Sequence, residues 1–148
     1  MNKLSVLAFA LLSPVVAHAS NCNIEVTSSD QMRFDKNLIT IDKSCSAVNL
    51  TLNNAGTLPK TAMGHNIVIV KKADVDTVAQ ASMAAGPASE YVKADHPKIL
   101  AHTKMLGGGE KDTVSVDPSK FQVGEEYVFF CSFPGHRALM SGNVVVAR

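Results

Sequence analysis

Three side chains in one short segment combine sulfur and nitrogen donors at close spacing. His136 follows Cys131 after four intervening residues, and Met140 follows His136 after three more. A thiolate, an imidazole and a thioether together suit copper, because sulfur donors favour Cu(I) and imidazole accepts either oxidation state. The Pro134-Gly135 pair between them predicts a tight loop that folds the donors around one point. The segment therefore predicts a copper site.

A second imidazole is needed to complete a trigonal plane of two histidines and one cysteine. His65 is the natural candidate, because it stands in the segment Met63-Gly64-His65-Asn66 just ahead of an apolar run at 67–70. Although 66 positions separate His65 from Cys131, two loops at the same end of a β-sandwich can meet. We therefore include His65 in the predicted site.

The elements that must position these residues appear as short runs of alternating or β-branched residues. Such runs occur at 23–27, 37–42, 48–52, 67–70, 113–116, 127–130 and 144–146, with turn residues between them. Regularly spaced short strands predict a β-sandwich or barrel. One Ala-rich stretch at 73–85 has apolar residues at helical spacing and stops at Gly86-Pro87, which predicts a short helical insertion.

The first 19 residues predict an export signal. Lys3 precedes an apolar run from Leu4 to Leu12, and Ala17 and Ala19 have the spacing that signal peptidase reads. The run is shorter than the roughly 20 residues that a spanning helix needs, which argues against a membrane anchor. We expect cleavage after Ala19 and one copper-binding domain over residues 20–148, in the periplasm if the host has two membranes.

The charge balance excludes some classes of partner. The chain has 14 basic and 13 acidic residues, and loss of Lys3 makes the two numbers equal. This balance argues against nucleic-acid binding, which usually needs a basic excess. It also argues against strong long-range steering toward a charged partner. We expect a soluble monomer with no membrane insertion.

Three cysteines leave one thiol to explain, because an exported protein tends to pair its cysteines. Sequence allows three pairings. Cys22 and Cys45 both lie near the start of the chain, whereas Cys131 lies beside a histidine, so we favour the pair Cys22–Cys45. That bond closes a loop of 24 residues, worth about 3 kcal/mol in the chain-entropy model.

Taken singly, the predicted donors have ordinary explanations. A free cysteine is commonly an inert buried thiol, a methionine commonly fills a core, and a loop histidine commonly lies on the surface. An exported chain that keeps an unpaired Cys131 beside His136 and Met140 is rarely an accident. The combination therefore favours a metal site over the ordinary explanations.

The metal loop and several other segments resemble the cupredoxin family of type 1 blue copper proteins. The resemblance covers essentially the whole chain after residue 19, including the helical stretch, and it implies an all-β, Greek-key sandwich. Beyond the loop at 131–140, the segments that carry it are Asp30–Met32, Asp42–Cys45, Leu58–Lys60, Met63–Asn66, Ile99–Lys104, Gly109–Asp112 and Phe129–Cys131.

This resemblance implies one copper ion and a ligand set. His65 and His136 would give imidazole nitrogens and Cys131 would give a thiolate. Met140 would be a long axial ligand, with the Gly64 carbonyl oxygen weakly bound on the opposite side.

Further roles follow from the same resemblance. It implies that Cys22 and Cys45 form the disulfide, in agreement with the pairing favoured above. It also implies that backbone N–H groups of Asn66 and Phe133 reach the Cys131 sulfur, where they would tune the reduction potential.

The resemblance also implies an apolar docking patch around His136, for c-type cytochromes and for periplasmic redox enzymes such as nitrite reductase or amine dehydrogenase. From the residues alone, Met32, Leu58 and Met83 are equally consistent with a core. The patch would contain Met32, Leu58, Ala62, Met63, Met83, Phe133, Pro134 and Ala138.

The predicted function is electron transfer by one copper, and three alternatives compete with it. A periplasmic copper chaperone or store would favour exposed, exchangeable ligands. A multicopper enzyme needs further histidine ligands, but after residue 19 the chain has only His65, His96, His102 and His136. A structural zinc site would accept cysteine and histidine but rarely a thioether. An enzyme is therefore not expected.

Overall fold

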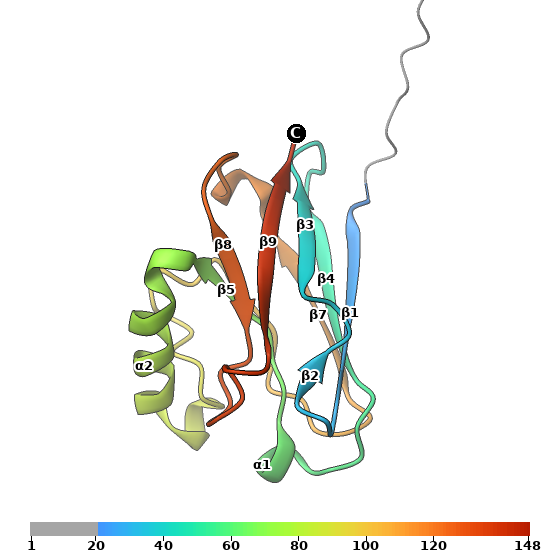
Figure 1. The fold of residues 1–148 in the computed structure, drawn as a ribbon, viewed down its shortest axis with the longest axis vertical. Coiled ribbons are helices and arrows are strands. Elements are labelled where there is room, and N and C mark those ends of the chain that lie inside the picture. Colours follow the sequence, from blue (N-terminus) through green and yellow to red (C-terminus); the bar gives the residue numbers. More distant parts are fainter. Residues whose placement is uncertain (1–20) are drawn as a thin grey trace, which may run out of the picture.

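The computed structural model describes residues 21–148, so the predicted export signal and its cleavage after Ala19 lie outside the described residues. Two β-sheets face each other and form a sandwich (Figure 1). The first sheet has the order β2 (Arg33–Phe34), β1 (Asn23–Ser29), β4 (Val48–Asn54), β7 (Lys111–Val116). The second has the order β3 (Leu38–Asp42), β9 (Ser141–Ala147), β8 (Tyr127–Phe130), β5 (Val68–Lys71), β6 (Ala101–His102).

Each sheet contains one parallel pair among antiparallel neighbours. β1 runs parallel to β4, and β3 runs parallel to β9. Since β3 belongs to the second sheet, the chain crosses between the sheets before it returns to place β4 beside β1. This mixed arrangement agrees with the predicted all-β, Greek-key sandwich that carries a helical insertion.

The core lies between the two sheets, where alternate residues of each strand point inward. In β4, Val48, Leu50 and Leu52 are fully buried while Asn49 is exposed. Phe129 of the opposite sheet belongs to the same apolar cluster. Burial of each such side chain contributes about 1.5–3 kcal/mol to the stability of the fold. The alternation in the sequence therefore places the apolar side chains where their burial holds the two sheets together.

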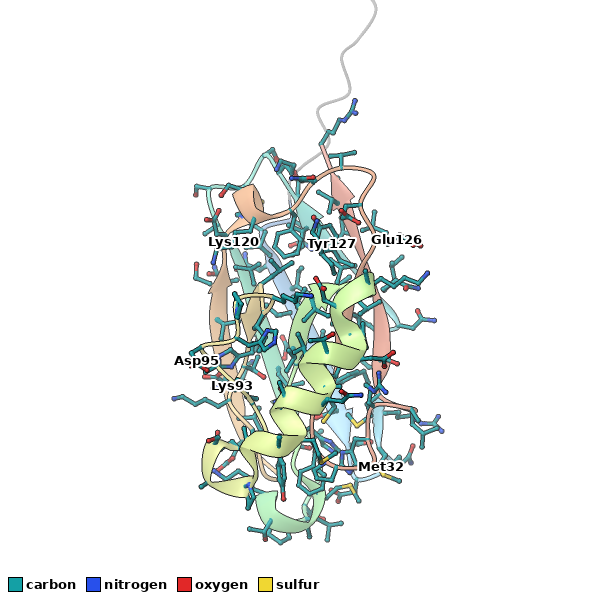
Figure 2. The ribbon with its side chains drawn as sticks, turned by 90° about the vertical axis from the view of Figure 1, so that its left-hand side faces the viewer. Met32, Lys93, Asp95, Lys120, Glu126 and Tyr127 are labelled. Carbon is teal, nitrogen blue, oxygen red and sulfur yellow. A yellow bond between two sulfur atoms is a disulfide. The ribbon has the colours of Figure 1, made fainter. Side chains whose placement is uncertain are left out.

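The helical insertion packs on the outer face of the second sheet (Figures 1 and 2). A 3₁₀ turn at Lys72–Asp74 leads into α2 (Val75–Ala85), and Gly86 ends the helix with φ of 73°. Val78 of α2 is buried in a second apolar cluster with Val70 and Phe130. The sequence therefore located the helix, although its first residues form a 3₁₀ turn.

Three short elements were not predicted. These are β2, β6 and α1 (Lys60–Met63), each of at most four residues. Such lengths are too short to show a periodic pattern. Two further 3₁₀ turns lie between the predicted strands and helix, at Pro87–Ser89 and Pro118–Lys120.

The two ends of the sandwich carry different features. The loop between β8 and β9 lies at the same end as α1, and the C-terminus lies at the other end (Figure 1). Cys22, just ahead of β1, forms a disulfide with Cys45, which lies between β3 and β4. Among residues 21–148, no helix is long and apolar enough to cross a membrane.

Candidate metal centre

The structure brings three of the predicted ligands together in the interior. His65, Cys131 and His136 each offer a ligand atom, and these atoms lie within 4.8 Å of one another. The Cys131 Sγ atom is 3.8 Å from Nδ1 of His136. All three residues are buried, with exposed fractions of 0 % for His65 and Cys131 and 3 % for His136.

The loop that carries Cys131, His136 and Met140 is closed by its own backbone. Cys131 follows β8 directly, and its N–H donates to the carbonyl of Met140 at 2.9 Å. The N–H of Met140 donates to the carbonyl of His136 at 2.8 Å, and the N–H of His136 donates to Phe133 at 3.1 Å. Gly135 supplies the turn with φ of 82°. The spacing in the sequence therefore corresponds to a compact, hydrogen-bonded loop.

His65 is held in place by hydrogen bonds of its backbone and of its ring. Its backbone forms an isolated β-bridge with Leu106. The His65 nitrogen is 3.0 Å from the Leu106 oxygen, and the Leu106 nitrogen is 2.8 Å from the His65 oxygen. Its Nε2 atom lies 3.0 Å from the carbonyl oxygen of Ser29. Since a carbonyl only accepts, Nε2 carries the proton and Nδ1 keeps a free lone pair. A single external hydrogen bond thus selects the ligand nitrogen.

The Nδ1 atom of His65 is the observation that tests the fit of a metal. It is buried and has no hydrogen-bond partner among the described residues. A buried acceptor left unpaired costs about 1–3 kcal/mol, so such atoms call for an explanation. Because Nδ1 lies in the cluster with Cys131 and His136, a metal ion that accepts its lone pair supplies one. The donor set fits copper.

Burial favours the uncharged form of each of the three donors. It raises the pKa of the Cys131 thiol to about 11, although the N–H groups of Asn66 and Phe133 act in the opposite direction. Burial, and secondarily the neighbouring His65, lowers the pKa of His136 to about 4. Burial also lowers the pKa of His65. A neutral imidazole is the form that binds a metal, and the Cys131 thiol would have to give up its proton to act as a ligand.

Gly64 and Met140 lie in the same region. The Gly64 carbonyl oxygen is 3.8 Å from the Cys131 sulfur, and the Met140 side chain is fully buried. A Cβ at position 64 would come within 2.6 Å of the Lys60 carbonyl and 2.9 Å of the Met105 sulfur. Close packing therefore requires glycine here. Its backbone conformation does not, because a φ of −70° suits any residue.

A side-chain clamp joins the two ligand-bearing loops. The amide nitrogen of Asn66 donates to the Ser132 hydroxyl at 2.8 Å, and the Ser132 N–H donates to the Asn66 amide oxygen at 2.8 Å. Both residues are buried, each next to a predicted ligand. The family resemblance implied only a backbone role for Asn66. No local pattern reveals this pairing, because 66 positions separate the partners.

A chain of rings backs the cluster. The centroids of His65 and His136 are 5.1 Å apart, and Phe133 lies 4.5 Å from His136. Tyr91 packs edge-on against Phe133 at 5.5 Å. Tyr91 was not predicted, because no motif in the sequence around it indicates a contact with Phe133. These contacts hold the ring of His136 between aromatic surfaces.

The residues of the predicted docking patch are not part of the core. Leu58 and Met83 are 41 % and 48 % exposed. A further exposed apolar residue, Leu139, was not predicted. His96 and His102 lie outside the metal cluster. Among the patch residues, Ala62 and Ala138 are also exposed, and Met32, Met63, Phe133 and Pro134 are half-buried.

Comparison with known proteins agrees with this geometry. Residues 20–147 match the model of the copper-binding proteins of the plastocyanin/azurin family. The chain is 42 % identical to azurin of Pseudomonas aeruginosa over 146 residues, which cover 99 % of both chains. It is 46 % identical to azurin of Bordetella pertussis, covering 93 % of this chain and 91 % of the relative. It is 49 % identical to azurin of Pseudomonas chlororaphis, covering 86 % of this chain and 99 % of the relative. With a buried His-Cys-His cluster and a family match over its whole described sandwich, the chain belongs to the plastocyanin/azurin family of copper-binding proteins.

Proposed function

We propose that this protein is a periplasmic blue copper electron carrier that holds one copper ion and passes single electrons between redox partners. The observation that carries the proposal is the buried cluster of His65, Cys131 and His136, in which Nδ1 of His65 has no other partner among the described residues. Membership of a family of copper-binding proteins supports the same function.

The proposed ligands would be two imidazole nitrogens, one thiolate, one thioether and one backbone carbonyl oxygen. His65 and His136 give Nδ1, Cys131 gives Sγ, Met140 gives its thioether and Gly64 gives its carbonyl oxygen. When bound, copper supplies one-electron chemistry by changing between Cu(I) and Cu(II). The protein supplies the donors, their positions and the surrounding apolar medium.

The chain's own residues hold these donors in a fixed arrangement. The backbone bridge to Leu106 holds His65, and β8 together with the bond to Met140 holds Cys131. The Asn66–Ser132 clamp fixes the distance between the two loops. Because a rigid frame leaves little to rearrange when an electron moves, it favours fast transfer.

The site suits a carrier better than a catalyst. All proposed donors come from the protein, and His65, Cys131 and Met140 are fully buried. A substrate has no open position to bind, whereas a catalytic metal keeps one. Proteins of this family are electron carriers rather than enzymes.

The proposed exit for the electron is His136, at the apolar patch. His136 is 3 % exposed and lies beside the half-buried Phe133. An exposed apolar patch usually marks a docking surface, and weak redox encounters use small interfaces. We propose c-type cytochromes and periplasmic redox enzymes such as nitrite reductase or amine dehydrogenase as the partner class.

Export through a signal at residues 1–19 completes the proposal. The Cys22–Cys45 disulfide is what an oxidising compartment favours. N-terminal sequencing of protein from the periplasmic fraction should start at Ser20. A chain that keeps residues 1–19 and stays in the cytoplasm would contradict this location.

A copper chaperone or store is the alternative. Such a protein must release its ion, which favours exposed ligands that a recipient can reach. Here, none of the three clustered ligands is more than 3 % exposed. Burial therefore favours the carrier.

The deciding experiment is an optical and EPR titration of residues 20–148 with Cu(II), followed by ascorbate. A type 1 site predicts an intense blue colour, an unusually small copper hyperfine splitting, one copper per chain and reversible bleaching. Cys131→Ser should abolish the blue band. His102→Gln, which removes a histidine outside the cluster, should keep it. A pale protein with ordinary copper EPR would reject the carrier and favour the chaperone or a zinc site.

A further inference from the structure

Two shallow hollows flank the metal loop on the side of α2. One has a volume of about 280 Å³ and is lined by α2 and by residues of the loop, including Cys131 and Phe133. The other, of about 390 Å³, lies farther along α2. Both are lined by Ala79, Met83 and Arg137, so these residues form the ridge that they share. Because Met83 and Phe133 also belong to the docking patch, the first hollow extends that patch toward α2.

Arg137 is the cation next to His136 in this otherwise apolar region. Its guanidinium donates to the Asp76 carboxylate of α2 at 2.7 Å. The Arg137 side chain is 45 % exposed and that of Asp76 is 83 % exposed. An ion pair as exposed as this stabilises a protein very little. A different carboxylate can therefore replace Asp76 at little cost.

The second ion pair near the patch differs in this respect. Lys60 donates to Glu90 at 2.6 Å, and the other oxygen of Glu90 accepts the N–H of Met105 at 3.3 Å. Glu90 is thus tied to the backbone as well as to Lys60, and it is only 38 % exposed. Since the Lys60 charge is held by a more constrained partner, Arg137 is the cation that an incoming group can recruit.

We propose that the redox partner presents a protein carboxylate to Arg137, which takes the place of Asp76, while an apolar side chain of the partner enters the hollow beside Met83. This inference rests on the proposed electron-carrier function. Arginine suits the role because its planar fork matches a carboxylate with two parallel hydrogen bonds. An apolar patch alone does not fix the orientation of a partner, whereas a charge pair at its edge does. The balanced overall charge limits long-range steering, so the contact acts at short range.

The test is stopped-flow electron transfer from reduced cytochrome b5, an acidic protein, to the copper-loaded chain. One electron leaves the haem Fe(II), which becomes Fe(III), and reduces Cu(II) to Cu(I). Arg137→Ala should lower the second-order rate constant about three- to tenfold at low ionic strength, and high salt should remove the difference. Arg137→Lys should keep most of the rate. Asp76→Asn should raise it, because it frees Arg137.

A matched control removes a cation far from the patch. Lys120 is exposed and lies at the opposite end of the molecule from Met32 (Figure 2). Lys120→Ala should stay within about twofold of the wild type, because it removes a charge outside the proposed contact and leaves the Arg137 pair intact. With reduced mitochondrial cytochrome c, a basic protein, Arg137→Ala should leave the rate unchanged or raise it.

The outcomes separate two kinds of failure. If wild-type protein exchanges electrons but Arg137→Ala behaves like Lys120→Ala, the inference about the partner is wrong and the carrier function stands. Equal losses with both cytochromes would point to lost packing and would also overturn the inference. If copper-loaded wild type exchanges electrons with neither cytochrome, the carrier function itself is overturned, and the inference with it.

Discussion

His65 acts through both of its ring nitrogens. Its Nε2 is occupied by the Ser29 carbonyl at 3.0 Å, and its Nδ1 is left in the cluster without another described partner. The bond to Ser29 thus selects the tautomer before any metal binds. The hydrogen bond between Nε2 and the Ser29 carbonyl therefore leaves Nδ1 as the nitrogen that can bind a metal.

Asn66 contributes at the same scale, because its side chain satisfies two groups of Ser132 in a buried place. Asn66→Ala should lower the free energy of unfolding of the metal-free protein by about 2 kcal/mol, since it leaves a buried N–H and hydroxyl unpaired. Urea denaturation measures the change. Asn49→Ala, which breaks an exposed bond to Asn23, is the matched control and should stay within about 0.5 kcal/mol. Equal effects of the two substitutions would contradict the clamp.

At the scale of elements, strands and the helix have separate tasks. The ligands come from the end of β8, from the loop before β9 and from the segment ahead of β5. α2 carries no proposed ligand but covers the outer face of the sheet that contains β5 and β8 (Figure 2). The packing of α2 against this sheet therefore stabilises the fold. Its exposed residues Met83 and Asp76 face the proposed docking region.

Val78 lies fully buried in the cluster between α2 and the sheet. Val78→Ala should destabilise the protein by about 1–2 kcal/mol, because it removes two methyl groups from a packed site. The blue absorption of the copper-loaded protein should survive, since no ligand lies on α2. Thr77→Ala, on the exposed side of the same helix, should change stability by less than about 0.5 kcal/mol. An unchanged unfolding midpoint for Val78→Ala would show that the helix does not pack as described.

At the scale of the whole molecule, the disulfide and the metal loop lie at opposite ends. The bond between Cys22 and Cys45 joins the start of β1 to the turn before β4. Replacing both cysteines by serine should lower the free energy of unfolding by about 3 kcal/mol, chiefly through the unfolded chain. The copper absorption should be unchanged. A loss of blue colour at unchanged stability would mean that the two ends are coupled in a way this structure does not contain.

Acid should destabilise the fold through carboxylates spread over the surface. The backbone N–H of Thr57 lowers the pKa of Asp30, and hydrogen bonds from Ser44 and Ser119 lower the pKa values of Asp42 and Asp117. A lowered folded pKa means that the unfolded chain binds more protons, so stability falls as pH falls. This contribution is complete above the ordinary value of 3.8 and is lost as pH falls through the lowered values.

Urea midpoints of the metal-free protein between pH 7 and pH 3 measure this loss. Asp30→Asn should show a smaller decrease below pH 4 than the wild type, because it lacks one of the titrating groups. Glu126→Gln removes a carboxylate from an exposed ion pair with Lys72 and serves as control. Parallel curves for the wild type and Asp30→Asn would rule out a role for Asp30 in acid stability.

Much of the architecture could be predicted because it depends on local pattern. Strands such as β4 alternate buried and exposed residues, and that period is visible in the chain. The helical stretch predicted at 73–85 from apolar spacing and from Gly86 contains α2 at 75–85. By contrast, β2 and β6 have two residues each, and their existence depends on the strand beside them. Partners of that kind are distant in sequence, so no local pattern announces them.

The sequence by itself determined the types of donor and their local spacing: a thiolate, an imidazole and a thioether within ten residues after a strand. It also limited the possible disulfide pairings to three, because the chain has only three cysteines. The tertiary structure alone decided that Nδ1 of His65 lies free beside Cys131, that Asn66 clamps Ser132, and that Arg137 pairs with Asp76. The physical reason is that donor chemistry belongs to single residues and spacing to the local backbone. Contacts between loops depend instead on the register of strands far apart in the chain.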